Sequence, residues 1–121
     1  MMESIQGLES VQGAGARAVK LALDAAALRH QAIAHNLANL GSENYVPLGV
    51  SFESQLGAAR DARLARPELV QDLSRGVGPR PQDVDSEMVK LAQNTIHYQA
   101  LTRALGKVYA MLRETINEGK R

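Results

Sequence analysis

The chain has 121 residues, which is enough for one small domain and too few for two. Aromatic residues make up only 3% of it, which disfavours a β-sandwich or a barrel, and cysteine is absent, which excludes disulfides, thiolate zinc sites and a cysteine nucleophile. A formal net charge of +1 gives no indication of nucleic-acid binding. These exclusions leave a small, mainly helical protein. Its alanine-rich composition predicts a thin core, which we expect other molecules to complete.

The first 15 residues are polar and contain three glycines. They have no apolar stretch of the kind found in secretory signals, so we expect no cleaved signal peptide. We predict that residues 1–15 form a flexible leader with at most one weak helical turn. The sequence contains no run of 18 apolar residues, so no membrane span is expected either.

Residues 16–40 contain neither glycine nor proline and are rich in alanine and leucine. These residues favour a helix, and Gly41 stands where a helix commonly ends. Residues 83–118 contain no proline and, apart from Gly106, no glycine, and we predict a second long helix over this range. Asp83 and Asp85 are candidates for its N-cap.

The middle of the chain, residues 41–82, contains all four prolines and half of the ten glycines. We predict a loop-rich linker here. Residues 45–52 have the composition of one or two short strands, residues 53–64 that of a short helix, and residues 76–81 that of a stiff extended segment. Five arginines fall between positions 60 and 80, either as a solvated loop or as a recognition patch.

Apolar residues in both predicted helices recur at alternating steps of four and three residues. This period of 3.5 is typical of a coiled-coil seam. We therefore predict a mainly α fold, in which the two long helices pair as an antiparallel coiled-coil hairpin. The proposed helix-pairing seam comprises Leu23, Ile33, Leu37, Met88, Leu91, Tyr98, Leu105, Leu112 and Ile116.

A second row of small and apolar residues lies on another side of the first helix. A helix that is apolar on two sides is buried on two sides. We expect another molecule to cover this row; the alternative is a closed three-helix bundle that uses the middle segment. The row consists of Ala14, Ala18, Leu21, Ala25, Leu28 and Ala32.

No pattern in the sequence points to catalysis. His30 and His35 are five residues apart and so do not share a helix face for a metal ion. Nucleotide-binding and hydrolase motifs are absent, and helix capping explains the acidic pairs. We predict no catalytic residues, no cofactor, no metal site and no enzyme activity.

The first predicted helix ends in Asn36-Leu37-Ala38-Asn39, and Tyr45 follows six residues later. This stretch resembles the N-terminal motif of bacterial flagellar rod and hook proteins. In that family an alanine-rich helix ends in an Asn-(Ile/Leu)-Ala-Asn turn, which a Thr-Pro-Gly-Tyr-like segment follows. Glu43 and Asn44 replace the Pro and Gly here, and asparagine tolerates the left-handed conformation that glycine would supply. The matching motif residues are Asn36, Leu37, Ala38, Asn39 and Tyr45.

Residues 84–101 and 112–121 resemble the C-terminal helix of the short proximal members of this basal-body rod family. The resemblance covers about residues 20–56 and 83–119. It implies a structural subunit that pairs its terminal helices and stacks into the hollow rod that crosses the periplasm and transmits torque. It also implies type III export without a cleaved signal.

The partners that the resemblance implies are the chain itself, other rod subunits, and the MS-ring/rod adaptor and export gate at the proximal end. Nucleic acid and a direct membrane span are not among them. Within the family, a neighbouring proximal rod subunit is the alternative. From another class, the alternative is a small helical adaptor or export chaperone that binds one partner in the cytoplasm.

We expect Asn36 and Asn39 to end the first helix and to bond backbone groups in the turn, because asparagine side chains commonly compete for such bonds. The alternative is a direct contact with a neighbouring subunit.

Overall fold

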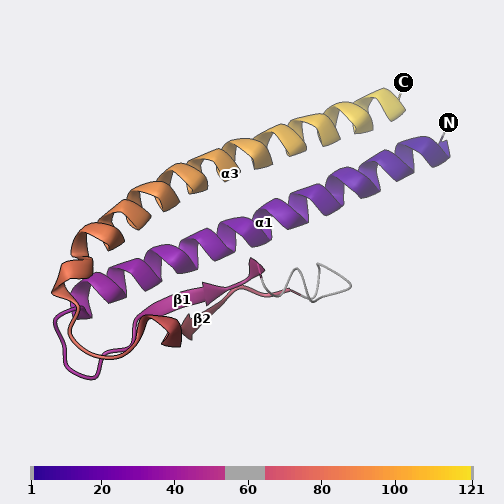
Figure 1. The fold of residues 1–121 in the computed structure, drawn as a ribbon. Coiled ribbons are helices and arrows are strands. Elements are labelled where there is room, and N and C mark those ends of the chain that lie inside the picture. The colour runs from indigo at the N-terminus through magenta and orange to yellow at the C-terminus, as the bar shows by residue number, and fades with distance from the viewer. Residues whose placement is uncertain (1, 54–64, 121) are drawn as a thin grey trace.

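The computed structural model describes residues 2–53 and 65–120, and within them two long helices dominate. Helix α1 spans Met2–Asn39 and helix α3 spans Val84–Gly119. They run antiparallel and side by side, with both chain termini at the same end of the pair (Figure 1). The predicted mainly α fold, with two long paired helices and a middle loop region, is confirmed.

Helix α1 is longer than the sequence predicted. It begins at Met2, so residues 2–15 are helical where we expected a flexible leader. Each glycine there costs about 1 kcal/mol relative to alanine. A helix that is already formed gains one hydrogen bond for each added residue, so glycines weaken its first turns without ending it.

The turn after α1 is built by local hydrogen bonds. The amide of Ser42 donates to the carbonyl of Asn39 at 2.9 Å, which closes the last turn. Asn44 then adopts a φ of 61°, which is the left-handed conformation that glycine would supply at this position of the family motif.

Helix α3 starts directly after a 3₁₀ turn at Pro81–Asp83. Asp85 and Glu87 place negative charge in its first turn, as the helix dipole favours. Asp83 occupies the N-cap position but makes no side-chain capping bond. Its carboxylate instead lies 3.3 Å from the guanidinium of Arg75.

The middle segment forms a two-stranded antiparallel sheet that lies along α1 (Figure 1). Strand β1 spans Leu48–Ser51 and pairs with strand β2, Glu68–Gln71, in a register that sets Leu48 opposite Gln71. Strand β1 falls where the sequence suggested strands. Strand β2 was not expected, because its four exposed residues do not alternate between apolar and polar. The short helix predicted over residues 53–64 lies, beyond Glu53, outside the described residues.

A small apolar core joins this sheet to α1. Phe52 and Ala65 are buried against Ala25, with Leu21 and Val50 packed around them. The middle segment therefore covers part of the second apolar row of α1, and the expectation that another molecule covers it is wrong at Leu21 and Ala25. The physical reason is that alanine side chains are small enough for the single phenylalanine to pack closely on the helix.

Replacing Phe52 by alanine should lower the free energy of unfolding by about 3 kcal/mol, because the lost side chain leaves a cavity against Ala25. Urea denaturation followed by circular dichroism at fixed protein concentration measures this. Leu73→Ala is the matched control, since Leu73 is exposed and its loss should change the value by less than about 0.5 kcal/mol. Equal effects of the two variants would contradict this view of the core.

Candidate functional site

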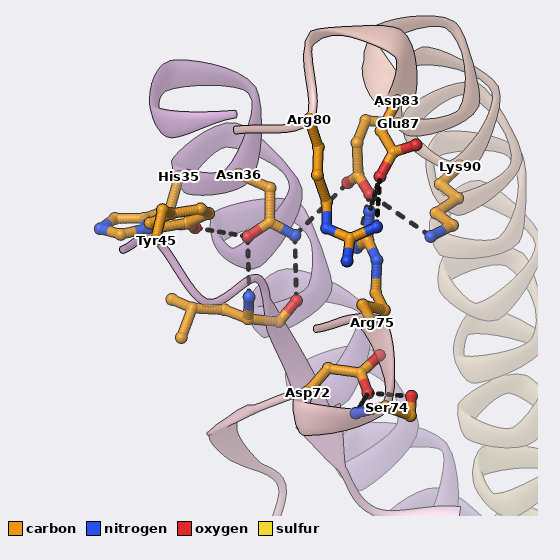
Figure 2. A network of polar contacts seen from close by, with 11 residues as sticks. His35, Asn36, Tyr45, Asp72, Ser74, Arg75, Arg80, Asp83, Glu87 and Lys90 are labelled. Carbon is orange, nitrogen blue, oxygen red and sulfur yellow. Dashed lines mark hydrogen bonds and ion pairs between the residues drawn. The ribbon is translucent and has the colours of Figure 1, made fainter. Parts of the chain in front are cut away.

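The side chain of Asn36, in the last turns of α1, holds strand β1 to the helix. Its Oδ1 accepts a hydrogen bond from the amide of Leu48 at 2.8 Å, and its Nδ2 donates to the carbonyl of Leu48 at 3.0 Å (Figure 2). One side-chain amide thus satisfies both peptide groups of a strand residue. Asn36 supplies for Leu48 what a neighbouring strand would otherwise supply.

Asn36 also uses its remaining hydrogen-bonding capacity. The Tyr45 hydroxyl donates to Oδ1 at 2.5 Å, and Nδ2 lies 3.4 Å from Oε2 of Glu87. An amide side chain has two donors and two acceptor positions, and all four are occupied here. Asn36 is only 1% exposed, so the loss of one of these partners leaves a buried polar atom, which is costly.

His35 extends this network to the surface. Its Nδ1 lies 2.8 Å from the hydroxyl of Tyr45. Since the single hydroxyl proton of Tyr45 is donated to Asn36, the hydroxyl oxygen must accept here, and Nδ1 of His35 must carry a proton. Burial of Tyr45 raises the pKa of its hydroxyl, the negative charge of Glu87 raises it further, and Arg75 opposes both.

The charged centre of the site is Glu87, in the first turn of α3. Its side chain is fully buried, and its Oε1 lies 2.7 Å from Nη1 of Arg75 and 3.3 Å from Nζ of Lys90. Arg75 follows strand β2 and also reaches Asp83 at 3.3 Å. We call Asn36, Tyr45, Arg75, Asp83 and Glu87 the polar cluster (Figure 2). It connects α1, the sheet segment and α3 at one end of the helix pair.

Two of the linker arginines therefore have partners within the chain. Arg75 pairs with Glu87, and the Nη1 atom of Arg80 lies 3.8 Å from Asp83. Gly76 is required beside them: it has a φ of 79°, and a Cβ there would lie 2.5 Å from the guanidinium of Arg80. Neither arginine belongs to a freely solvated loop, and both contribute to the packing around the start of α3.

Asn39 makes a simpler contact than Asn36. Its Nδ2 donates to the carbonyl of His35, one turn earlier in α1, at 2.8 Å. Both motif asparagines thus bond backbone groups, but Asn36 bonds those of strand β1 and Asn39 a carbonyl within α1, whereas we expected bonds in the turn. Leu37 is half-buried and Ala38 is exposed within the same motif.

The proposed seam residues differ in how far the single chain covers them. Ile33 is buried, and Leu23 and Leu37 are half-buried on α1. On α3, Leu91, Leu105 and Leu112 are half-buried, but Met88 is 51% exposed, Tyr98 44% and Ile116 38%. The seam of α3 is therefore partly covered at its leucines and open at the other three residues, which we call its open edge, and its use as a whole in pairing stays a prediction.

The most buried residues of α3 are instead polar. Glu87 and Asn94 stand seven residues apart on the covered side, and Nδ2 of Asn94 donates to the carbonyl of Ala26 at 2.8 Å. A search for apolar periodicity misses both. The signal that was available is their spacing, because residues seven apart return to the same helix face.

Among the described residues there is no group of three or more acidic or histidine side chains arranged to hold a metal ion. In the same part of the chain, no helix has the length and apolar character needed to cross a membrane.

Comparison with known proteins points to one relative. The chain is 29% identical over 120 aligned residues to the flagellar basal body rod protein FlgB of Bacillus subtilis (strain 168), and the alignment covers 82% of this chain and 90% of the relative. The chain is FlgB-like. The family resemblance drawn from the motifs at both ends of the sequence is thereby confirmed. No family model and no solved structure matches this FlgB-like chain.

The two motif asparagines should differ in their contribution to stability. Asn36→Ala should lower the free energy of unfolding by about 3 kcal/mol, because it leaves the amide and carbonyl of Leu48 and the hydroxyl proton of Tyr45 without their partner. Asn39→Ala removes a single bond and should cost about 1 kcal/mol. Chemical denaturation of both variants measures the difference, and equal losses would show that the four bonds of Asn36 are not made together.

Breaking the buried ion pair should be more costly than breaking the exposed one. Glu87→Gln should destabilise the chain by about 3 kcal/mol, because it removes the closer of the two carboxylates that neutralise Arg75 and leaves only Asp83 at 3.3 Å. Lys90→Gln is the control: Lys90 is half-exposed, and its pair with Glu87 should contribute less than about 1 kcal/mol. A double-mutant cycle of Arg75→Met with Glu87→Gln measures the coupling, and a value near zero would contradict the assigned pair.

Proposed function

We propose that this chain is a structural subunit of the bacterial flagellar basal body, which assembles with other rod proteins into the proximal rod. The observation that carries the proposal is the alignment with FlgB, which spans nearly the whole of that relative. The fold supports it, because the first and last parts of the chain form one helix pair and leave the middle segment beside it.

The surface proposed for assembly is the open edge of the α3 seam. Val84, Met88, Tyr98, Tyr109 and Ile116 are between 38% and 51% exposed, although all are apolar or aromatic. Val84 and Tyr109 extend the open edge at the spacing of the predicted seam. The half-buried Leu91 and Leu105 stand between these residues, which offer apolar contacts for another helix.

A hollow of about 450 Å³ between α1 and α3 adjoins this open edge. Tyr98 forms part of both, and small residues of α1 line the opposite wall. A side chain from a neighbouring helix fits such a hollow, as in the packing of knobs into holes. The lining residues are Ala26, Ala27, His30, Gln31, Asn94, Thr95, Tyr98 and Gln99.

In the proposed assembly, copies of the chain and other rod subunits stack into a hollow tube in the periplasm that transmits torque. At its proximal end the tube meets the MS-ring/rod adaptor and the export gate. The subunits reach this site through type III export without a cleaved signal. No catalytic step is involved, and the helices serve as the mechanical element.

Complementation of a strain that lacks the gene tests this proposal. A tagged chain should be recovered in purified basal bodies and should restore swimming. Met88→Asp should fold normally by circular dichroism but lose both properties, because it places a charge in the open edge of the seam. Met111→Asp is the matched control, since Met111 has similar exposure and lies outside the open edge.

Normal incorporation of Met88→Asp into basal bodies would contradict the proposed surface. Recovery of the parent chain only in the cytoplasm, as a stable dimer or bound to one exported protein, would instead favour the adaptor or export chaperone.

A further inference from the structure

The contact between Asn94 and α1 is an unusual feature of the helix pair. Asn94 is 8% exposed, and its amide donates to a main-chain carbonyl, that of Ala26, at 2.8 Å. Ala25 and Ala26 have no exposed surface at this point. Their side chains are single methyl groups, which allows a side chain of α3 to reach the backbone of α1.

A second buried polar contact joins the two helices nearby. Nδ2 of Asn36 lies 3.4 Å from Oε2 of Glu87. Glu87 and Asn94 are seven residues apart, so they lie on the same face of α3 and about 10 Å apart along its axis. The helices are therefore tied at two separate points.

The rest of the covered face of α3 does not determine an alignment. Leu91, Leu105 and Leu112 are half-buried and repeat at intervals of seven or fourteen residues. A shift of α3 by seven residues sets Leu105 in the place of Leu112. Tyr98 and Val84 then take the places of Leu105 and Leu91, so apolar or aromatic side chains still meet α1. The same shift would take Asn94 away from Ala26 and Glu87 away from Arg75, leaving a buried amide and a buried charge without partners.

We propose that Asn94 is a specificity-determining residue: through its bond to the Ala26 carbonyl it fixes the register of α3 against α1 and keeps α3 paired within its own chain. Buried asparagines are known to select register and partner in coiled coils at a cost in stability. The proposal stands on these contacts alone and does not depend on the role in the rod. It matters wherever many copies of the chain meet, because α1 of each copy offers the same apolar face.

Chemical cross-linking in the full chain tests the proposal, and the absence of native cysteines makes it straightforward. Nζ of Lys20 lies 5.4 Å from the ring centre of Tyr109, so Lys20→Cys with Tyr109→Cys reports the native register. Lys20→Cys with Thr102→Cys reports a shift of seven residues. A short bismaleimide reagent and mass spectrometry distinguish products within a chain from products between chains.

In the parent background only the native pair should cross-link, and within one chain. Asn94→Leu should keep its helix content and raise the shifted or the interchain product by about tenfold, because the unsatisfied amide no longer penalises those pairings. Asn94→Ala should do the same without added bulk. Gln93→Leu, which alters the neighbouring exposed amide, is the matched control and should preserve the parent pattern.

Unchanged cross-linking in Asn94→Leu and Asn94→Ala would overturn the proposal. Loss of helix content in both variants would overturn it as well, because the bond would then be a requirement for folding. A shifted register in Gln93→Leu would also overturn the proposal, because any change in polarity on this face would then have the same effect.

Discussion

A carboxylate that is wholly removed from solvent, that of Glu87, constrains how three separate parts of the chain meet. An isolated charge in such a position would be costly, so the structure must bring compensating groups to it. Arg75 arrives from the segment after β2, Lys90 from the next turn of α3, and Asn36 from the end of α1. The charge therefore connects segments that apolar packing alone would leave loosely associated.

The weak apolar attachment of the sheet explains why this constraint matters. All four residues of β2 are exposed, and the apolar cluster that joins the described part of the middle segment to α1 is small: Phe52, Ala65 and Val50 lie around Ala25. At the opposite end of the sheet, Asn36 bonds both peptide groups of Leu48. A small apolar contact and a polar contact thus hold the described part of the sheet segment to α1, and Asn36 of the polar contact also reaches Glu87, which Arg75 neutralises.

The long helices and their antiparallel pairing were predictable, because alanine-rich composition and a period of 3.5 residues are local properties of the sequence. The left-handed conformation of Asn44 was expected from the family resemblance, in which glycine stands at this position. Strand β2 was not, since its exposed residues carry no alternating pattern and its pairing with β1 is a tertiary contact. The helical state of residues 2–15 depends on propagation from the packed part of α1, which glycine content does not reveal.

The polar cluster was only partly predictable. The motif drew attention to Asn36, Asn39 and Tyr45, but it did not show that Glu87 and Asn94 are the most buried residues of α3. Burial of a charged or amide side chain depends on partners far away in the sequence, and a hydrophobic pattern excludes such residues from the start. For the same reason Arg75 could not be assigned as a partner of Glu87 before the fold was known.

Hydrogen exchange of the Leu48 amide tests most directly whether the polar cluster organises the fold around Glu87. This amide donates to the buried Oδ1 of Asn36. Mass spectrometry or NMR of the full chain should find it protected to the same degree as the middle of α1 and α3, and Glu87→Gln should increase its exchange while the helices remain protected. Rapid exchange of the Leu48 amide in the parent chain, with both helices protected, would contradict the account.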